Sequence, residues 1–418
     1  MKVLAAHPLL VSLRDAISFE AVGDAVGNLT VGRGTFDRRA LHVAIVEGRV
    51  ASGSLGTAEC QHLAGLFEIV AEERSSLVVF LDSAGARVSE GLRALGAFRA
   101  LYRAGLNAAF SGAPIAMALG RNCFGGASML AHLAPQRLFA QNTQLAMSGP
   151  TIIASATGVD VQDEMFRAMA EASMSPAARV KASPANDVWK EGDDLAAWLS
   201  EALAQRGDAA RGLRLRHDAL ELRLDKRIGA RPWESIRRRD LERIYEKYEA
   251  RESDGLVLGQ GTRDGEQCAF AGIVGRNPLG ASRAWRFSDA VWKMCDEPPR
   301  RLEVLLDCAS HAARLDDERI VLTEYIVDMG FALSALARRG TQVGLMVLGK
   351  AGGGVYVALA APAQRVTSVY GADIQVLPGA AVAAILGQSN ETTPSFQEYL
   401  AAAVADEELK LGIIPGTQ

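Results

Sequence analysis

The stretch Leu119-Gly-Arg-Asn-Cys-Phe-Gly-Gly-Ala-Ser128 follows an apolar run that begins at Ile115, and it passes through two glycines into small residues. This pattern predicts a strand, a tight turn and the start of a helix. Glycine lets the backbone approach a ligand closely, and the first N–H groups of a helix have no partner within the helix. Gly125 and Gly126 are therefore typical of an oxyanion hole, although close packing of helix and strand is the commoner explanation of one such turn.

The same arrangement returns in the second half of the chain. Four pairs of segments correspond: 77–82 and 302–307, 117–120 and 346–349, 125–126 and 353–354, and 135–137 and 362–365. From residue 125 to residue 353, and from 137 to 365, the offset is 228 residues. Solenoid repeats are only about 20 to 50 residues long, so this repeat indicates duplication of a whole domain.

The length of 418 residues agrees with two domains, for which we predict the ranges 1–225 and 226–418. The composition is 49% apolar and 22% charged, with a formal net charge of −4, so we expect neither nucleic acid nor a membrane as a partner. Charges or glycines interrupt every apolar window before about 18 residues, and the N-terminus is too short in its apolar part for a signal peptide. We therefore expect a cytoplasmic protein.

The five cysteines are scattered and form no Cys-x-x-Cys pair, so we expect no metal site and predict that they are buried apolar residues. Residues 1–36 resemble an irregular lead-in. Two strands at 41–46 and 49–56, followed by a helix from Thr57, are predicted to form a ββα unit. The pattern also predicts a loop over 175–191 and, in the second copy, a helix over 288–295.

Two loops are expected at the carboxyl ends of neighbouring strands, where α/β proteins bind ligands. They are Asp82-Ser-Ala-Gly-Ala-Arg87 and the turn at Gly125-Gly126, which would together supply two backbone N–H groups. Asp82 and Asp307 are expected to cap the turns that follow them.

Residues 211–251 contain 11 arginines interspersed with acids and leucines. They could form a docking face for an acidic partner, such as an acyl carrier protein or a CoA phosphate. We favour a solvated helical connector with i,i+4 ion pairs, broken at 229–232.

Four elements together resemble the carboxyltransferase branch of the crotonase superfamily. They are Gly53-Ser-Leu-Gly56, Asp82-Ser-Ala-Gly-Ala-Arg87, Cys123-Phe-Gly-Gly126 with Ser148-Gly-Pro150, and Gly349-Lys-Ala-Gly-Gly-Gly-Val-Tyr356. Within that branch the chain is similar to the β and γ subunits of biotin-independent malonate decarboxylase, joined in one chain. The second glycine run is also close to the pattern of biotin-dependent carboxyltransferases.

The resemblance implies an α/β fold of two tandem crotonase-like ββα-superhelix domains, with an active site between them, often across a dimer interface. It implies that Gly125 and Gly126 hold the thioester oxygen. Gly353, Gly354 and Val355 would form a second hole. The residues implied in substrate binding are Gly85, Ala86, Arg87, Ser148, Gly149 and Lys350.

The implied reaction is decarboxylation of a malonyl thioester carried on CoA or on the phosphopantetheine of an acyl carrier protein, with no covalently bound cofactor. No Met-Lys-Met biotin site is present. The proton for the resulting enolate could come from His311, Lys350 or water. Two alternatives stay open: a biotin-dependent carboxyltransferase component, and a non-catalytic scaffold for a carrier protein, which the loop Ala309-Ser-His311 supports because γ subunits tend to have Pro-Gly there.

Two further expectations concern the glycine pairs. The chain should form at least a homodimer, because the two pairs must meet across one cleft. A β-branched residue at Gly126 should push the thioester away from the N–H groups while the fold largely survives.

Overall fold

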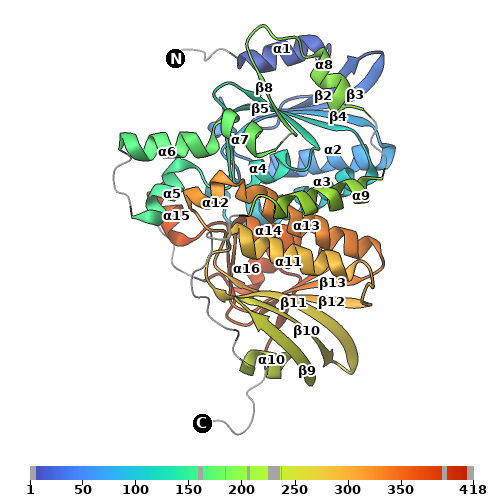
Figure 1. Cartoon of the computed structure of the whole chain (residues 1–418), viewed down its shortest axis with the longest axis vertical. Helices are drawn as coiled ribbons and strands as arrows, with labels where there is room; N and C mark the ends of the chain where they lie inside the picture. Colours follow the sequence, from blue (N-terminus) through green and yellow to red (C-terminus); the bar gives the residue numbers. More distant parts are fainter. Residues whose placement is uncertain are drawn as a thin grey trace.

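The computed structural model describes residues 6–158, 163–183, 185–204, 208–224, 236, 238–387 and 393–411. The helical layers of the two halves face each other between two β-sheets, with the first half at the top of Figure 1 and the second half below it. Among the described residues, no helix has the length and apolar character that a membrane span requires.

The first half is built on a sheet with the strand order β1-β2-β3-β4-β5-β6-β8, with β7 paired to the end of β5. Its strands are β1 Glu20–Ala21, β2 Leu29–Phe36, β3 Arg39–Val46, β4 Ser76–Ser83, β5 Ile115–Phe124, β6 Gln136–Ala140, β7 Gln144–Ala146 and β8 Asn186–Trp189. Its helices are α1 Pro8–Ala16, α2 Thr57–Glu73, α3 Leu92–Ser111, α4 Gly126–Ala131, α5 Pro150–Thr157, α6 Glu164–Met174, α7 Pro176–Ala182, α8 Ala196–Ala202 and α9 Ala209–Glu221, with short 3-10 turns η1 Ala51–Gly53 and η2 Val88–Glu90.

The second half repeats this plan in a sheet with the order β17-β15-β13-β12-β11-β10-β9 and a small separate pair, β14-β16. Its strands are β9 Lys247–Ser253, β10 Leu256–Arg263, β11 Glu266–Arg276, β12 Arg301–Cys308, β13 Gln342–Val347, β14 Lys350–Gly352, β15 Arg365–Val369, β16 Asp373–Gln375 and β17 Glu407–Leu409. Its helices are α10 Arg238–Ile244, α11 Ala281–Met294, α12 Leu315–Arg319, α13 Leu322–Arg338, α14 Gly353–Ala360, α15 Gly379–Leu386 and α16 Phe396–Ala401.

Each half starts with antiparallel strands and continues with parallel ones, and equivalent helices separate equivalent strands. The pair β14-β16 takes the place that the end of β5 and β7 hold in the first half. The predicted α/β fold class, with two tandem domains of the same plan, is confirmed.

Several local predictions were wrong. The hairpin partner of β3 is β2, within the supposed lead-in, and residues 51–53 of the predicted second strand form η1. The range 175–191 contains α7 and the edge strand β8. Helix α11 begins at Ala281, seven residues before the predicted start, because Asp317 accepts its first N–H at 2.9 Å.

The prediction that Asp82 and Asp307 cap the turns that follow them was also wrong. Asp82 Oδ1 accepts the Asn122 N–H at 3.0 Å, and Asp307 Oδ1 accepts the Lys350 N–H at 2.8 Å. Each carboxylate therefore holds the neighbouring strand at the bend that leads into a glycine turn. The same contact in both halves supports the duplication.

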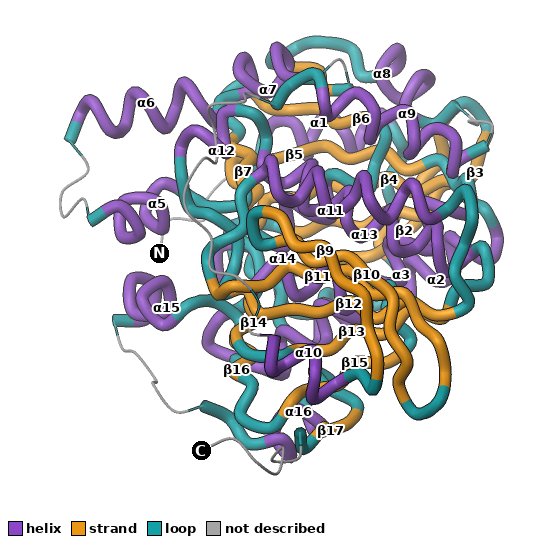
Figure 2. Tube along the Cα trace, turned by 60° about the horizontal axis from the view of Figure 1, so that its bottom comes forward, coloured by secondary structure: helices purple, strands orange, loops and turns teal. Residues whose placement is uncertain are grey.

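One apolar cluster runs through both halves, because α3 and α4 pack against α13 and α14. All five cysteines are buried, as predicted. Helix α5 of the first half packs against α15 of the second, and the two helices lie next to each other at the left of Figure 2.

A buried ionic cluster also joins the halves. Glu324 of α13 accepts hydrogen bonds from Arg137 of β6, at 3.1 Å, and from Arg223, which follows α9; Arg216 of α9 lies 3.8 Å away. Burial alone would raise the pKa of Glu324, but Arg223, Arg216 and Arg137 hold it well below its usual range.

Part of the arginine-rich segment therefore has a structural function that neither reading of the sequence anticipated. Helix α9 packs against α11 and α13, and His217 of α9 is hydrogen-bonded to Asp328 at 2.7 Å. The predicted domain boundary at 225/226 and the break at 229–232 lie outside the described residues, as do the side chains of 237–239.

Candidate active site

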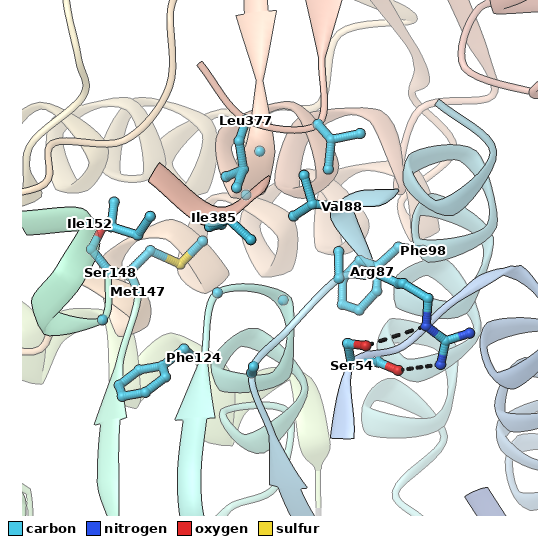
Figure 3. Close-up of a pocket in the computed structure, with 18 of the residues that line it drawn as sticks. Ser54, Arg87, Val88, Phe98, Phe124, Met147, Ser148, Ile152, Leu377 and Ile385 are labelled. Carbon is cyan, nitrogen blue, oxygen red and sulfur yellow. Dashed lines mark hydrogen bonds between the residues drawn. The ribbon is translucent and has the colours of Figure 1, made fainter. Parts of the chain in front are cut away.

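Both glycine turns line one cavity of about 370 Å³ between the two halves of a single chain. Figure 3 shows Phe98, Phe124 and Met147 from the first half around this cavity, with Leu377 and Ile385 from the second. Gly125, Gly126, Gly353 and Gly354 all belong to its wall. The two turns thus meet without a second chain, which removes the reason for which we predicted a dimer; the dimer itself stays a prediction.

The first turn offers one N–H group from Gly126 rather than two from Gly125 and Gly126. The Gly125 N–H donates to the Ala146 carbonyl at 3.2 Å, so it is already used by strand β7. Gly126 is the first residue of α4, and among the described residues no acceptor lies within hydrogen-bond distance of its N–H. Gly125, at φ 55° and ψ −126°, sets the orientation of the peptide that carries this N–H group.

The second candidate donor at this turn is the N–H of Ala86, which lines the cavity. The neighbouring Leu55 donates to the Gly85 carbonyl at 2.8 Å and accepts the Arg87 N–H at 2.8 Å, so the Ala86 N–H points away from Leu55. The loop lies against the glycine turn, because a Cβ on Gly85 would be 2.7 Å from the Phe124 carbonyl oxygen and 3.6 Å from the Gly126 nitrogen. Ala86 and Gly126 both lie in the cavity wall, at the two strand ends that were predicted to supply a pair of donors, and their role as donors stays a prediction.

The second half repeats this geometry with His311 in the place of Ala86. Leu279 donates to the Ser310 carbonyl and accepts the Ala312 N–H, both at 2.8 Å, so the His311 N–H points away from Leu279. Gly353 has a positive φ of 53°, like Gly125, and Gly354 follows it into α14. Val355, predicted as part of this hole, is buried inside α14 and is absent from the cavity wall that the described residues form.

The His311 imidazole joins the two halves at the cavity. Its Nε2 atom lies 2.9 Å from Ser148 Oγ of the first half, and its Nδ1 atom lies 3.2 Å from Ser310 Oγ. Burial lowers the pKa of His311 to about 4, so the ring is neutral at physiological pH.

Glu318 of α12 fixes the backbone beside this histidine. Its carboxylate accepts the Met147 N–H at 3.2 Å and the Ser148 N–H at 2.8 Å. Burial raises the pKa of Glu318 to about 7, against the opposing effect of the Arg179 guanidinium. Ser148 is therefore held from the second half through both its backbone and its hydroxyl group.

Two residues predicted to bind substrate have other contacts. Arg87 lines the cavity, but its guanidinium donates to Ser54, Glu59 and Glu90 (Figure 3 shows the two bonds to Ser54). Lys350 is exposed and is absent from the described cavity wall, so a role in binding would involve a part of the substrate outside the cavity. Ser148 and Gly149 are in the wall, while Gly85 lies behind it.

The expectation that the fold tolerates a β-branched residue at Gly126 was wrong. A Cβ there would lie 2.5 Å from the ring of Phe98, which is buried in the shared core. Gly354 is just as closely packed, since a Cβ would lie 2.1 Å from Met147 Cε. Both glycines thus serve packing as well as the exposure of an N–H group.

The wall is mainly apolar, and the described residues contain no cluster of side chains that could hold a metal ion. Three residues of the site were not predicted from the sequence: Phe98, Met147 and Glu318. They reach the site only through long-range packing. The hydrogen bond between the Ser310 side chain and His311 was also not predicted.

Residues 16–176 match the family model of the carboxyl transferase domain. This part of the chain is therefore similar to a carboxyl transferase domain. It contains the first glycine turn, Ala86 and Ser148, so the first half of the cavity lies within the matched region.

The chain is similar to several known proteins, over different lengths. The beta6 subunit of the biotin-dependent acetyl-/propionyl-coenzyme A carboxylase of Mycobacterium tuberculosis is 24% identical over 355 residues, which cover 81% of this chain and 72% of that subunit. The methylmalonyl-CoA carboxyltransferase 12S subunit of Propionibacterium freudenreichii is 31% identical over 157 residues, 37% of this chain and 30% of that protein. A structure of a Pseudomonas malonate decarboxylase hetero-tetramer with malonate is 21% identical, covers 53% of this chain and 91% of that chain, and has a TM-score of 0.44. The domain and its sequence relatives identify the chain as an enzyme.

The buried His311 predicts how stability changes with pH. An unfolded histidine titrates near pH 6.5, whereas the folded pKa is about 4, so the contribution of His311 to stability is present above pH 6.5 and is lost as the pH falls toward 4. Between pH 7 and pH 5, the free energy of unfolding should therefore fall by about 2 kcal/mol more in the wild type than in His311→Gln. Urea denaturation of both proteins at the two pH values measures this difference, and equal losses would contradict the neutral, buried imidazole.

Proposed function

We propose that the chain removes CO₂ from a malonyl-type thioester, carried on CoA or on the phosphopantetheine of an acyl carrier protein, without biotin. The observation that carries the proposal is that both glycine turns open into one cavity of one chain. Loss of CO₂ leaves an enolate, and the Gly126 and Ala86 N–H groups are preorganised for its oxygen. Each donor of this kind contributes about 3 to 4 kcal/mol to stabilisation of the transition state in acyl-transfer enzymes.

The second turn supports a reaction of one substrate. Met147 of the first half packs onto Gly354, so the space between the turns is narrow and has apolar walls. Because Gly126 and His311 line the same cavity, the thioester oxygen of a malonyl group would lie at Gly126 and its carboxylate at the His311 backbone. Pockets of about 300 Å³ or more are of the size that binds small ligands, so a cavity of about 370 Å³ suits an acyl thioester and the end of its pantetheine arm.

A second candidate is the carboxyltransferase step of a biotin-dependent acyl-CoA carboxylase. It is favoured by the similarity to the mycobacterial carboxylase subunit over 81% of this chain. The same enolate would form at Gly126 and Ala86 in that reaction, and the second turn would face the ureido oxygen of carboxybiotin. The two candidates therefore share the first turn and differ in what occupies the second.

A mass-spectrometric assay separates the candidates. The purified chain is mixed with malonyl-CoA, or with a malonyl-loaded acyl carrier protein, and the thioesters are followed over time without biotin. We expect acetyl thioester to accumulate, and the faster of the two substrates identifies the carrier. Unchanged malonyl thioester, together with carboxylation of acetyl- or propionyl-CoA when a carboxybiotinylated carrier is added, would overturn the proposal in favour of the second candidate.

A further inference from the structure

Three side chains form a hydrogen-bonded row that crosses from the first half of the chain to the second at the cavity. Ser148 Oγ lies 2.9 Å from His311 Nε2, and Ser310 Oγ lies 3.2 Å from His311 Nδ1. In the first half the places of Ser310 and His311 are taken by Gly85 and Ala86, which have no side chain that can give up a proton. Hydrogen-bonded side chains that can carry a proton therefore lie on one side of the cavity.

We propose that Ser148 gives the α-carbon of the enolate its proton, and that His311 and Ser310 restore the Ser148 hydroxyl. Ser148 would then be a catalytic residue, and the other two would act through it. The inference rests on the proposed function for the origin of the enolate, but the acid–base chemistry it assigns to Ser148 can be measured without loss of CO₂.

Ser148 is held close to the place where the enolate would form. It lies two residues beyond Ala146, whose carbonyl accepts the Gly125 N–H of the first turn. Glu318 fixes its backbone N–H at 2.8 Å and that of Met147 at 3.2 Å. Since the α-carbon is bonded to the carbonyl carbon whose oxygen faces the first turn, a hydroxyl on the adjoining wall is well placed to reach it.

The protonation state of the row follows from its burial and its partners. The buried imidazole is neutral, so it carries one N–H and one lone pair. We assign the proton to Nε2, because Nε2–H then donates to Ser148 Oγ, and Nδ1 accepts the Ser310 hydroxyl. This assignment leaves the hydroxyl proton of Ser148 free to point into the cavity.

The proton balance of the step is complete with water as the co-reactant. The electron pair of the enolate takes the proton of Ser148, so a C–H bond forms and the O–H bond breaks. The Ser148 alkoxide takes the Nε2 proton while Nδ1 takes that of Ser310. Water then reprotonates Ser310, and proton exchange with water moves the imidazole proton from Nδ1 back to Nε2, which returns the row to its starting state. The hydroxide left over combines with CO₂ as bicarbonate. Gly353, which lines the cavity, lies next to Ser310, because a Cβ on Gly353 would be 3.2 Å from the Ser310 hydroxyl oxygen.

Other proton donors are less suitable. Lys350 is exposed and outside the described cavity wall. Arg87 lines the cavity, but its guanidinium is bonded to Ser54, Glu59 and Glu90 and would remain charged. The cavity wall contains three further serines, Ser52, Ser54 and Ser89. Among the described residues, Ser148 is the serine of this wall that is hydrogen-bonded to a histidine.

Hydrogen exchange tests the role of Ser148 directly. Acetyl-CoA is incubated in D₂O with the wild-type chain, Ser148→Ala, Ser148→Thr, His311→Gln and Ser111→Ala, and deuterium in the acetyl group is measured by mass spectrometry. Ser111 lies at the end of α3, away from the cavity. The Ser111→Ala variant therefore controls for the loss of a serine hydroxyl group outside the site. We expect exchange to slow by roughly 10²-fold in Ser148→Ala and His311→Gln, and to persist in Ser148→Thr and Ser111→Ala.

A second measurement uses a 2-methylmalonyl thioester in D₂O. The wild type should give one enantiomer of the 2-deuteropropionyl product, and Ser148→Ala should give a racemic product. Unchanged exchange and unchanged stereochemistry in Ser148→Ala would overturn the inference. Exchange that depends on Ser148 in a chain that releases no CO₂ would instead overturn the proposed function and leave the acid–base role of Ser148 standing.

Discussion

Replacing Gly125 with alanine is expected to lower the rate of decarboxylation by about 10²- to 10³-fold, the effect of losing one oxyanion-hole donor. Gly125 has φ 55° and ψ −126°, a conformation open almost only to glycine. A Cβ at this position would meet nothing nearer than the Met147 carbonyl oxygen at 3.9 Å, so the substitution causes no clash. Alanine must instead change the backbone angles, and the peptide that carries the Gly126 N–H rotates away from the cavity. Steady-state kinetics with the malonyl thioester measure the effect.

Gly91 supplies a matched control for this substitution. It precedes helix α3 with nearly the same angles, φ 56° and ψ −135°, and a Cβ there would have no atom within 4 Å. Gly91→Ala should therefore carry a similar backbone strain, of about 1 to 3 kcal/mol, with turnover preserved. Full activity in Gly125→Ala, or an equal loss of activity in both variants, would remove the first turn from the chemistry.

The largest effect on stability is expected from Glu324→Gln. The substitution leaves Arg137, whose side chain is 1% exposed, without its buried carboxylate partner at 3.1 Å. Removing one partner of a buried ion pair costs about 3 to 5 kcal/mol, because the remaining charge is buried without compensation. Urea denaturation of the wild type and the variant measures the free energy of unfolding.

Glu68→Gln is the control for the loss of a carboxylate. Glu68 is exposed on α2, where such a change is usually worth less than about 0.5 kcal/mol. Arg137 and Arg223 come from the first half and Glu324 from the second, so a large loss in Glu324→Gln would indicate that this cluster couples the halves. A loss below about 1 kcal/mol would mean that the arginines find other partners or water.

The repeat and the glycine turns could be predicted from sequence because they depend on local patterns. An apolar run that ends in a glycine pair sets a strand, a turn and a helix within a few residues, and the second copy repeats it. The hairpin partner of β3 was missed for a physical reason. Gly32 and Gly34 remove the alternation typical of a strand, because a Cβ at either site would lie within 2.7 Å of a backbone oxygen of the residues packed beside it.

The identity of the free donors could not be predicted, since it depends on contacts distant in sequence. Gly125 and Gly126 look equivalent in the sequence, yet Ala146 accepts the N–H of one and leaves the other open. Arg87 has the residue type of a phosphate ligand, but Glu59 and Glu90 engage its guanidinium in three dimensions. The pairing of Ser148 with His311 joins residues of different domains and leaves no local signal.

Mixing two inactive variants tests most directly the claim that one chain forms the whole active site. Gly125→Ala damages the first turn and Gly353→Ala the second, at positions with φ of 55° and 53°. If the turns of one chain face the same cavity, each variant alone should be slow in decarboxylation, and a refolded equimolar mixture should be no faster than the mean of the two. Recovery of about a quarter or more of the wild-type rate in the mixture would mean that the first turn of one chain works with the second turn of another, which contradicts the account.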